Sequence, residues 1–341
     1  MSVLSKTFIT ALLVAATPEL ANALQYNTDK FAWKLTGFAT SGVIEPDLNS
    51  TLFIGDWRVR GQMNYVPNNE YKFGIVYALD QAALDKGKWA REAFTYVESA
   101  EYGRIEVGFT DSIARKLGVG LPDVGGLRIN DRPLYNEKIH ADGGIIPDTT
   151  LTSGRGALRL NAVTSPGEYA QYGVSVAGIT DDYDWAVDAG LKLRNSAGKV
   201  KTAYSLGMSF IDKPDNFDPE VYLPGVSADW RAQVSLGMNL QYNSWIVGVT
   251  TRAIYDQNPR GDVSDGIVAG IGASYDLMKY SVSLTYMFSD TGIWDSDIND
   301  FQDHTLIASF RYKYNEFVDV WMSGGTTVKT PFISAGLRLT F

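Results

Sequence analysis

The chain has 341 residues, of which 45% are apolar and 20% are charged, and this is enough to bury a large core in one or two domains. Its formal net charge is −9, which argues against nucleic acid as a partner because phosphate binding needs a basic surface. It contains no cysteine, so disulfide frameworks, thiolate zinc sites and cysteine nucleophiles are excluded.

The first 23 residues have the pattern of a secretory signal peptide. Lys6 supplies a positive charge, residues 8–16 form a short apolar run, and a small-x-small cleavage site (ANA) follows. The alternative is a buried N-terminal helix. We expect residues 1–23 to be removed, which leaves a mature domain over residues 24–341. No later segment approaches the ~20 apolar residues of a membrane helix, so the exported chain is either soluble or a membrane β-barrel.

Sixteen later segments alternate apolar with polar residues, which is the pattern of strands with one apolar and one polar face. For example, Trp230, Val234 and Leu236 share one face of their segment, and polar residues fill the other. Most segments have ten or more residues, a length suited to a tilted strand across a bilayer. The segments are 31–41, 52–65, 71–80, 88–99, 102–110, 154–164, 168–178, 183–194, 199–211, 229–242, 244–255, 265–276, 279–290, 304–315, 317–323 and 331–341.

The connections alternate between short turns and longer polar loops, as an up-and-down barrel with an even number of strands requires. Short turns such as 195–198 and 315–316 would lie at the periplasmic rim, and long loops such as 211–228 would lie outside the cell. Aromatic residues cluster beside the short turns, as an interfacial girdle does. We therefore predict an all-β protein, a 16-stranded antiparallel up-and-down transmembrane β-barrel. A soluble β-sandwich is the alternative, and the strand lengths and loop asymmetry weigh against it.

Two segments depart from the simple alternation. In the fourth segment Glu92 shares a face with Phe94. We expect that face to point outward and to be covered by another subunit, because a charge that faces lipid is costly. In the fifteenth segment Asp319 shares a face with Trp321, so we assign the opposite face of that segment to the lipid.

One connection, residues 111–153, is far longer than the others. Long loops in compact folds are usually functional or disordered, and sixteen strands enclose a lumen too wide for side chains to fill. The connection contains the run PDVGG at residues 122–126. Arg91 lies in the fourth predicted strand, Arg155 follows the connection directly, and the sequence ends on Phe341.

Together these features make the chain resemble the general porins of the Gram-negative outer membrane. In that family the third loop folds into the lumen and narrows it, often with a Pro-Glu-Phe-Gly-Gly run, and arginines line the opposite wall. The resemblance implies that 111–153 is the constriction loop and that Asp123 is its acid. It also implies that the constriction arginines are Arg91, Arg155 and, on the second strand, Arg58 or Arg60.

A second loop acid of the family has no direct counterpart, because Val119 stands at its position. Candidate substitutes are Asp131, Glu137 and Asp142. Strand alternation assigns further arginines to the lumen near the loop, among them Arg104 and Arg159. Opposed charges across a constriction create a transverse field that favours polar solutes. The surplus of arginines on the wall suggests a mild anion preference, which acids in the loops would oppose.

The resemblance also implies a homotrimer, contact with outer-membrane lipid and lipopolysaccharide, and a C-terminal Phe341 recognised by the barrel-assembly machinery. We expect small hydrophilic solutes and ions to pass through the channel, and we expect no cofactor, metal or enzymatic activity. His140 and His304 have no serine or aspartate partner fixed by spacing. Two alternatives stay open: a solute-selective channel, and a β-barrel adhesin or enzyme that uses the long loops.

Overall fold

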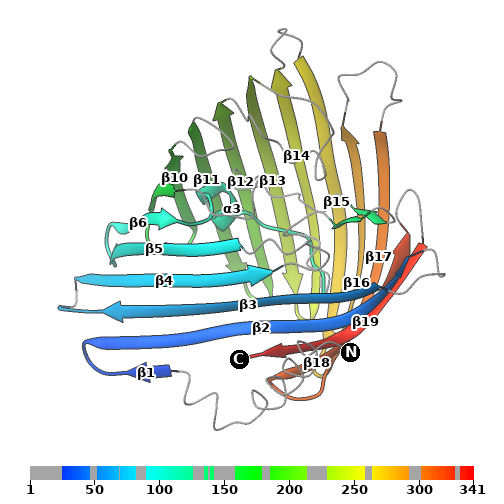
Figure 1. Cartoon of the computed structure of the whole chain (residues 1–341), viewed down its shortest axis with the longest axis horizontal. Coiled ribbons are helices and arrows are strands. Elements are labelled where there is room, and N and C mark those ends of the chain that lie inside the picture. Colours follow the sequence, from blue (N-terminus) through cyan, green and yellow to red (C-terminus); the bar gives the residue numbers. More distant parts are fainter. Residues whose placement is uncertain are drawn as a thin grey trace.

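The computed structural model is a closed barrel of sixteen antiparallel strands (Figure 1). The barrel strands are β2 (Phe31–Pro46), β3 (Leu52–Tyr65), β4 (Tyr71–Gln81), β5 (Ala90–Ser99), β6 (Gly103–Phe109), β9 (Leu158–Val163), β10 (Ala170–Ala177), β11 (Trp185–Ala197), β12 (Val200–Asp212), β13 (Trp230–Tyr242), β14 (Trp245–Gln257), β15 (Val263–Leu277), β16 (Tyr280–Thr291), β17 (Phe301–Lys313), β18 (Val318–Thr326) and β19 (Pro331–Thr340). The structure describes residues 25–46, 52–68, 70–81, 90–125, 134–136, 139–141, 158–178, 185–212, 229–257, 263–291, 301–326 and 331–341.

The barrel closes where its last strand meets its first. Strand β19 pairs antiparallel with β2, with Leu339 opposite Ala39, and every other barrel strand pairs with its neighbours along the chain. Across the long third connection, β6 pairs directly with β9. The short strand β1 (Gln25–Asn27) pairs with the start of β2, beyond the end of β19. The sixteen predicted strands are therefore confirmed, whereas β1 was not predicted.

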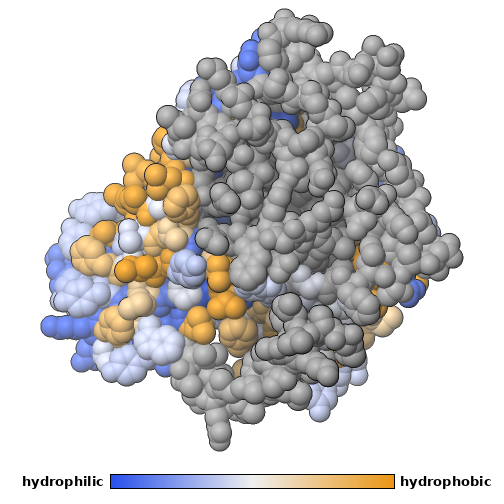
Figure 2. All heavy atoms as spheres, viewed as in Figure 1, coloured by the Kyte–Doolittle hydropathy of each residue, from blue (hydrophilic) through white to orange (hydrophobic). Residues whose placement is uncertain are grey.

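The alternation along the strands separates an apolar outer face from a polar inner face. On β13, Leu236 is 54% exposed and Gln233 is 1% exposed, although both lie in the middle of the strand. Exposed apolar residues also cover β6 and β10, and Figure 2 shows hydrophobic side chains gathered on the outside of that part of the barrel. An exterior that is more apolar than the interior is the arrangement that a lipid bilayer requires.

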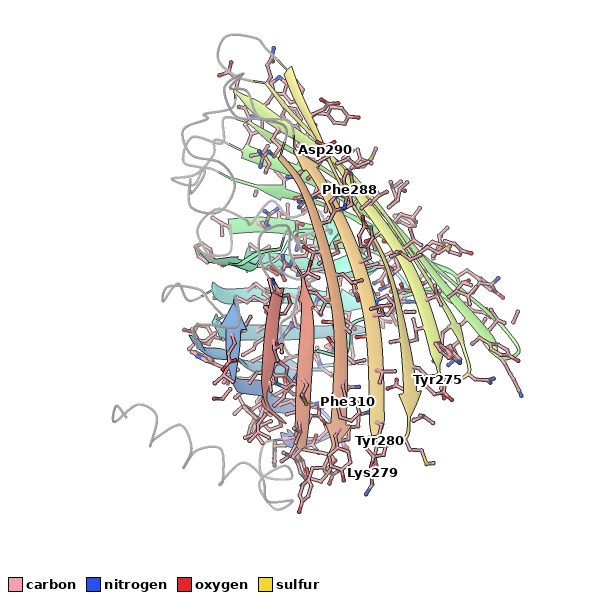
Figure 3. All side chains as sticks on the ribbon, turned by 90° about the vertical axis from the view of Figure 1, so that its right-hand side faces the viewer. Tyr275, Lys279, Tyr280, Phe288, Asp290 and Phe310 are labelled. Atoms are coloured by element: carbon pink, nitrogen blue, oxygen red, sulfur yellow. The ribbon has the colours of Figure 1, made fainter. Side chains whose placement is uncertain are left out.

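Aromatic side chains lie near both rims of the barrel. At the long-loop rim, the rings of Trp185, Phe210 and Trp230 stack across three neighbouring strands, with centroid distances of 5.2 and 6.0 Å. Figure 3 shows side chains of β15–β17 and of the turn after β15, with Tyr275, Lys279, Tyr280 and Phe310 toward one rim and Phe288 and Asp290 toward the other. These are the positions at which aromatic rings meet the membrane interface.

The structure corrects the predicted orientation of one strand. On β5, Phe94 and Tyr96 are each 3% exposed and face inward, and Glu92 lies on the same face. The Arg104 guanidinium lies 3.6 Å from the centre of the Tyr96 ring, so these aromatic rings pack against lumenal cations instead of lipid. The prediction for β18 is confirmed, because Trp321 is buried and its neighbours on the other face are exposed.

The third connection contains short elements that the alternation did not predict. Helix α3 (Ile113–Leu117) begins after Ser112, whose hydroxyl accepts a hydrogen bond of 3.2 Å from the Arg115 N–H. A small hairpin pairs β7 (Leu134–Asn136) with β8 (Ile139–Ala141). Within the described ranges, no helix is both long and apolar enough to cross a membrane.

Candidate functional site: a channel with two unlike walls

Residues 110–125, the first part of the third connection, run along the polar faces of strands β10 to β17. Their backbone groups bond to side chains of that wall, because a backbone N–H or C=O held away from water needs a partner. The bonds are Ile113 N–H to Ser175 Oγ (3.4 Å), Val119 N–H to Ser205 Oγ (2.9 Å), Asn239 Nδ2 to the Gly120 carbonyl (3.1 Å), Thr285 Oγ1 to the Pro122 carbonyl (3.2 Å) and Val124 N–H to Ser283 Oγ (3.1 Å). The segment is thus held at intervals along its whole length.

Glycines on the same wall make room for this segment. A β-carbon on Gly190 would lie 2.8 Å from the Ile113 carbonyl oxygen, and one on Gly248 would lie 2.6 Å from Pro122 Cδ. A β-carbon on Gly237 would meet the carbonyl oxygen of Val119. The segment therefore approaches the backbone of the wall more closely than any larger residue would permit. We call the surface formed by Gly190, Gly237, Gly248, Ser175, Ser205, Asn239, Ser283 and Thr285 the docking wall.

Asp123, the predicted loop acid, is held against β16 and β17. Its Oδ1 accepts hydrogen bonds from the Gly125 N–H (3.0 Å) and from the hydroxyls of Ser283 and Ser309 (3.3 Å each). Burial raises the pKa of the Asp123 carboxyl above its ordinary range, and these hydrogen bonds partly oppose the rise. Within the described part of the chain Asp123 forms no ion pair with an arginine, so its contacts anchor the segment to the wall.

The point where the segment leaves β6 is fixed by a buried carboxylate. Glu106 accepts hydrogen bonds from Lys116 Nζ, on α3, and from Asn161 Nδ2 on β9 at 2.9 Å. Asn161 also donates to the Asp111 carbonyl at 3.0 Å. Arg104 approaches the other carboxylate oxygen at 3.0 Å. Side chains from two barrel strands and from the helix therefore contact the same carboxylate.

A second buried ion pair ties β9 to the docking wall. Arg159 Nη1 lies 2.6 Å from Asp188 Oδ2, and both side chains are fully buried. The Ser175 hydroxyl donates to the same carboxylate oxygen at 2.8 Å while its oxygen accepts from the Ile113 N–H. The pair therefore supports one of the residues that hold the segment. Arg159, predicted as a further constriction residue, is buried in this network.

The facing strands β3 to β6 carry long charged side chains instead. Arg58 Nη2 lies 3.0 Å from Glu92 Oε2, and Arg60 Nη1 lies 3.8 Å from the same oxygen. The structure therefore brings together two of the predicted arginines, on β3, with an acid on β5. All three side chains keep some exposure to the lumen. We call Arg58, Arg60 and Glu92 the charged triad.

A second charged group lies on the same wall, closer to the short turns. Arg104 lies over the Tyr96 ring and pairs with Glu98 at 3.7 Å, and Lys72 approaches Glu98 at 3.4 Å. The Tyr96 hydroxyl accepts a hydrogen bond of 2.8 Å from Gln62. Arg104 is therefore lumenal, as predicted, and lies below the charged triad on the way to the short-turn rim.

Comparison with known proteins decides the family. A family profile described as "Gram-negative porin" matches residues 9–327. The chain belongs to the Gram-negative porin family. The protein is accordingly located in the bacterial outer membrane. No curated protein sequence matches the chain.

Solved structures with the same fold are porins and outer-membrane proteins of low sequence identity. The anion-selective porin of Comamonas acidovorans has 12% identity and a TM-score of 0.65, and the match covers 92% of this chain and 100% of that one. The Salmonella typhi OmpF complex with daunomycin has 12% identity and a TM-score of 0.64, with 93% and 100% covered. Vibrio cholerae OmpT has 13% identity and a TM-score of 0.65, with 92% and 100% covered.

Several predicted porin residues lie outside the described part of the structure. Arg91 is a residue of β5, in register with Leu79, but its side chain is not described. The residues wholly outside the described ranges are Arg155, Asp131, Glu137 and Asp142. The constriction roles of Arg155, Asp131, Glu137 and Asp142 stay predictions. Position 91 lies on the face of β5 opposite Glu92, so the corrected orientation of this strand does not support the lumenal role predicted for Arg91. Among the described residues, no group of three or more histidine, aspartate or glutamate side chains could hold a metal ion.

Sequence reasoning missed the docking wall and Glu92. The signal for the wall was present: glycine and serine repeatedly occupy the polar positions of β12–β16, where a solvated wall would tolerate larger polar residues. Glu92 was assigned to the wrong face because its aromatic neighbours were expected to meet lipid.

Phe341 lies at the barrel seam, where β19 pairs with β2 and closes the barrel. It exchanges two backbone hydrogen bonds with Gly37, of 2.8 and 3.0 Å. A β-carbon on Gly37 would lie 2.7 Å from Phe341 Cζ, so the ring packs directly on the β2 backbone. These contacts fix the end of the last strand. The predicted role of Phe341 as an assembly signal remains a prediction.

Proposed function

We propose that this porin is a water-filled channel for the passive diffusion of small hydrophilic solutes and ions across the outer membrane. The closed sixteen-strand barrel with a polar inner face carries the proposal, because a barrel of this size is too wide for side chains to fill. Membership of the Gram-negative porin family supports the same function. We expect no enzymatic activity.

We further propose that the third connection, residues 111–153, narrows this channel. Support comes from residues 110–125, which occupy one side of the lumenal face along the docking wall. The open side then faces the charged triad. Ions would pass between the segment and that wall, with Arg155 as a further proposed constriction residue. The arginines favour a mild anion preference, and the anion-selective Comamonas acidovorans porin shares this fold.

We also propose a homotrimer, with residues 1–23 as a cleaved signal peptide. The trimer form of Vibrio cholerae OmpT has the same fold and supports the assembly. The outer face of β3 offers a flat surface for it, since Gly55 and Gly61 lie there on either side of Trp57 and Val59. Lipopolysaccharide and the barrel-assembly machinery are the further partners that we propose.

Purified protein in a planar lipid bilayer tests the proposed function. We expect ohmic conductance of large unit size, with steps in groups of three if the channel is trimeric. Saturable block by one solute class would favour the solute-selective channel. A folded, inserted protein without conductance would leave the adhesin or the enzyme as the better hypothesis. Heat-dependent mobility on a gel serves as the control for folding.

A further inference from the structure

We propose that Glu92 is a selectivity-determining residue: its carboxylate sits between two lumenal arginines and cancels part of their positive charge. This inference rests on the proposed function as a channel. It assigns to β5 an acid, whereas the resemblance noted in the sequence led us to expect the constriction acids on the loop. The channel's ion preference would therefore be set within one wall, by the balance inside the charged triad.

The geometry places the three side chains at one height in the barrel. Ala78 on β4 is in register with Arg60 on one side and with Glu92 on the other. One carboxylate oxygen, Oε2, is shared, at 3.0 Å from Arg58 Nη2 and 3.8 Å from Arg60 Nη1. A single negative charge therefore faces two positive charges.

This height is also where the third connection begins. Ala93, the residue after Glu92, is in register with Phe109, the last residue of β6. The segment along the docking wall starts at the next position, Thr110. The charged triad therefore lies at the level where the segment turns away from β6, and a fixed charge there acts on ions that pass beside the segment.

Exposure decides which member of the triad an ion meets. The side chains of Arg58 and Arg60 are 26% and 35% exposed, whereas the side chain of Glu92 is 12% exposed. The two arginine side chains are thus more exposed to the lumen than the carboxylate between them. Glu92 reduces the field of the arginines without offering itself as a binding site for cations.

Other described acids on the inner face are held by different partners. Glu106 is bound by Lys116 and Asn161, and Asp188 is paired with Arg159. Asp123 lies against the docking wall. Through these contacts the three acids hold the loop segment in place. The partners of Glu92 are instead arginines on the wall opposite that segment.

The test is the reversal potential of Glu92→Gln in a salt gradient across a planar bilayer. Glutamine keeps the size of the side chain and a carbonyl oxygen for Arg58, but removes the charge. We expect the anion-to-cation permeability ratio to rise about two- to fivefold at moderate salt, the size expected for one unit charge ~6–8 Å from the ion path. An unchanged reversal potential would overturn the proposal.

A second variant separates charge from structural support. Arg58→Gln/Glu92→Gln has the same net charge as the native triad, so its permeability ratio should return to the native value. Arg58→Gln alone should shift the ratio in the opposite direction from Glu92→Gln. If the double variant instead has the permeability ratio of Arg58→Gln alone, Glu92 acts only by positioning Arg58 and the proposal is wrong.

Glu98→Gln is the matched control on the same strand. Glu98 pairs with Lys72 and Arg104 nearer the short-turn rim, away from the start of the loop segment. Loss of the Glu98 charge should shift the anion-to-cation permeability ratio by less than half as much as Glu92→Gln does. A shift of equal size would contradict the special role of Glu92. If the native protein folds but does not conduct, the proposed function fails, and this result is distinct from a conducting channel that Glu92 does not influence.

Discussion

The two walls of this lumen use the same strand geometry but different side chains. The docking wall presents glycine, serine, threonine and asparagine where residues 110–125 lie directly against it, and Arg231 and Arg252 are buried elsewhere on the inner faces of these strands. The wall on β3–β6 presents arginine, lysine and glutamate. Small residues let two backbones approach, and long charged residues remain solvated at their ends. The difference shows that one wall is built to hold protein and the other to face solution.

The largest expected effect lies at Arg159, where β9 is joined to the docking wall. Arg159→Met should lower the free energy of unfolding by about 3–5 kcal/mol, because it removes the cation from the buried Asp188 carboxylate. Urea unfolding in detergent micelles measures the change. The matched control is Arg159→Met/Asp188→Leu, which should recover most of the loss. A loss below about 1 kcal/mol for the single variant would contradict the structural role of this pair.

A methyl group on the docking wall is expected to have the next largest effect. Gly237→Ala would place a β-carbon against the Val119 carbonyl oxygen, so the segment must shift into the lumen. We expect a destabilisation of about 1–3 kcal/mol and a lower single-channel conductance. Gly324→Ala is the control, since its nearest neighbours would be 3.7 and 3.9 Å away. Equal conductance for the two variants would mean that the segment does not limit the channel.

Single hydroxyls of the docking wall should each contribute less. Ser205→Ala removes the acceptor of the Val119 N–H, and Ser283→Ala removes the acceptor of the Val124 N–H. Each change should cost about 0.5–1.5 kcal/mol of unfolding free energy. Thr36→Val is the control on β2, because it removes a hydroxyl that has only a long 3.5 Å contact with the Arg60 carbonyl. If neither serine variant differs from the control, water replaces both hydroxyls without loss.

The smallest expected effect is a change in pH dependence at Asp123. The raised pKa means that the docked carboxyl binds a proton more readily than the unfolded chain does. Its contribution to stability is therefore full below the ordinary pKa of the carboxyl and is lost as pH rises through the raised value. Asp123→Asn should remove this loss. The free energy of unfolding of the variant should therefore fall less between acidic and neutral pH than that of the native protein, with a difference of under about 1 kcal/mol. Parallel pH profiles for the two proteins would show that the carboxyl is not desolvated.

Much of the fold follows from the sequence because a membrane barrel repeats one rule. Alternating residues such as Leu236 and Gln233 must face lipid and lumen, so period two appears strand after strand. Where both faces carry aromatic or charged residues, the rule does not decide between them. Glu92 and Phe94 were misplaced for that reason, since the rings pack on lumenal cations.

The site was less predictable because its contacts join residues far apart in the sequence. The Val124 N–H reaches Ser283, and Asn239 reaches the Gly120 carbonyl. No local pattern in the third connection indicates these partners. Helix α3 had a weak local signal, since Ser112 is a favourable N-cap before Ile-Ala-Arg-Lys-Leu, but five residues are too few for a periodic pattern.

The seam between β2 and β19 also has a consequence for folding, since we expect it to close late. Leu339 and Ala39 are paired although 300 positions separate them (339 − 39). Loop-closure entropy makes such a remote pairing slow, because nearly the whole polypeptide must be confined before it forms. Until then β2 and β19 are open sheet edges that can add a foreign strand. We therefore expect the folding intermediate in which β2 and β19 are still unpaired to aggregate most readily. Pairing of β2 with β19 removes both exposed sheet edges.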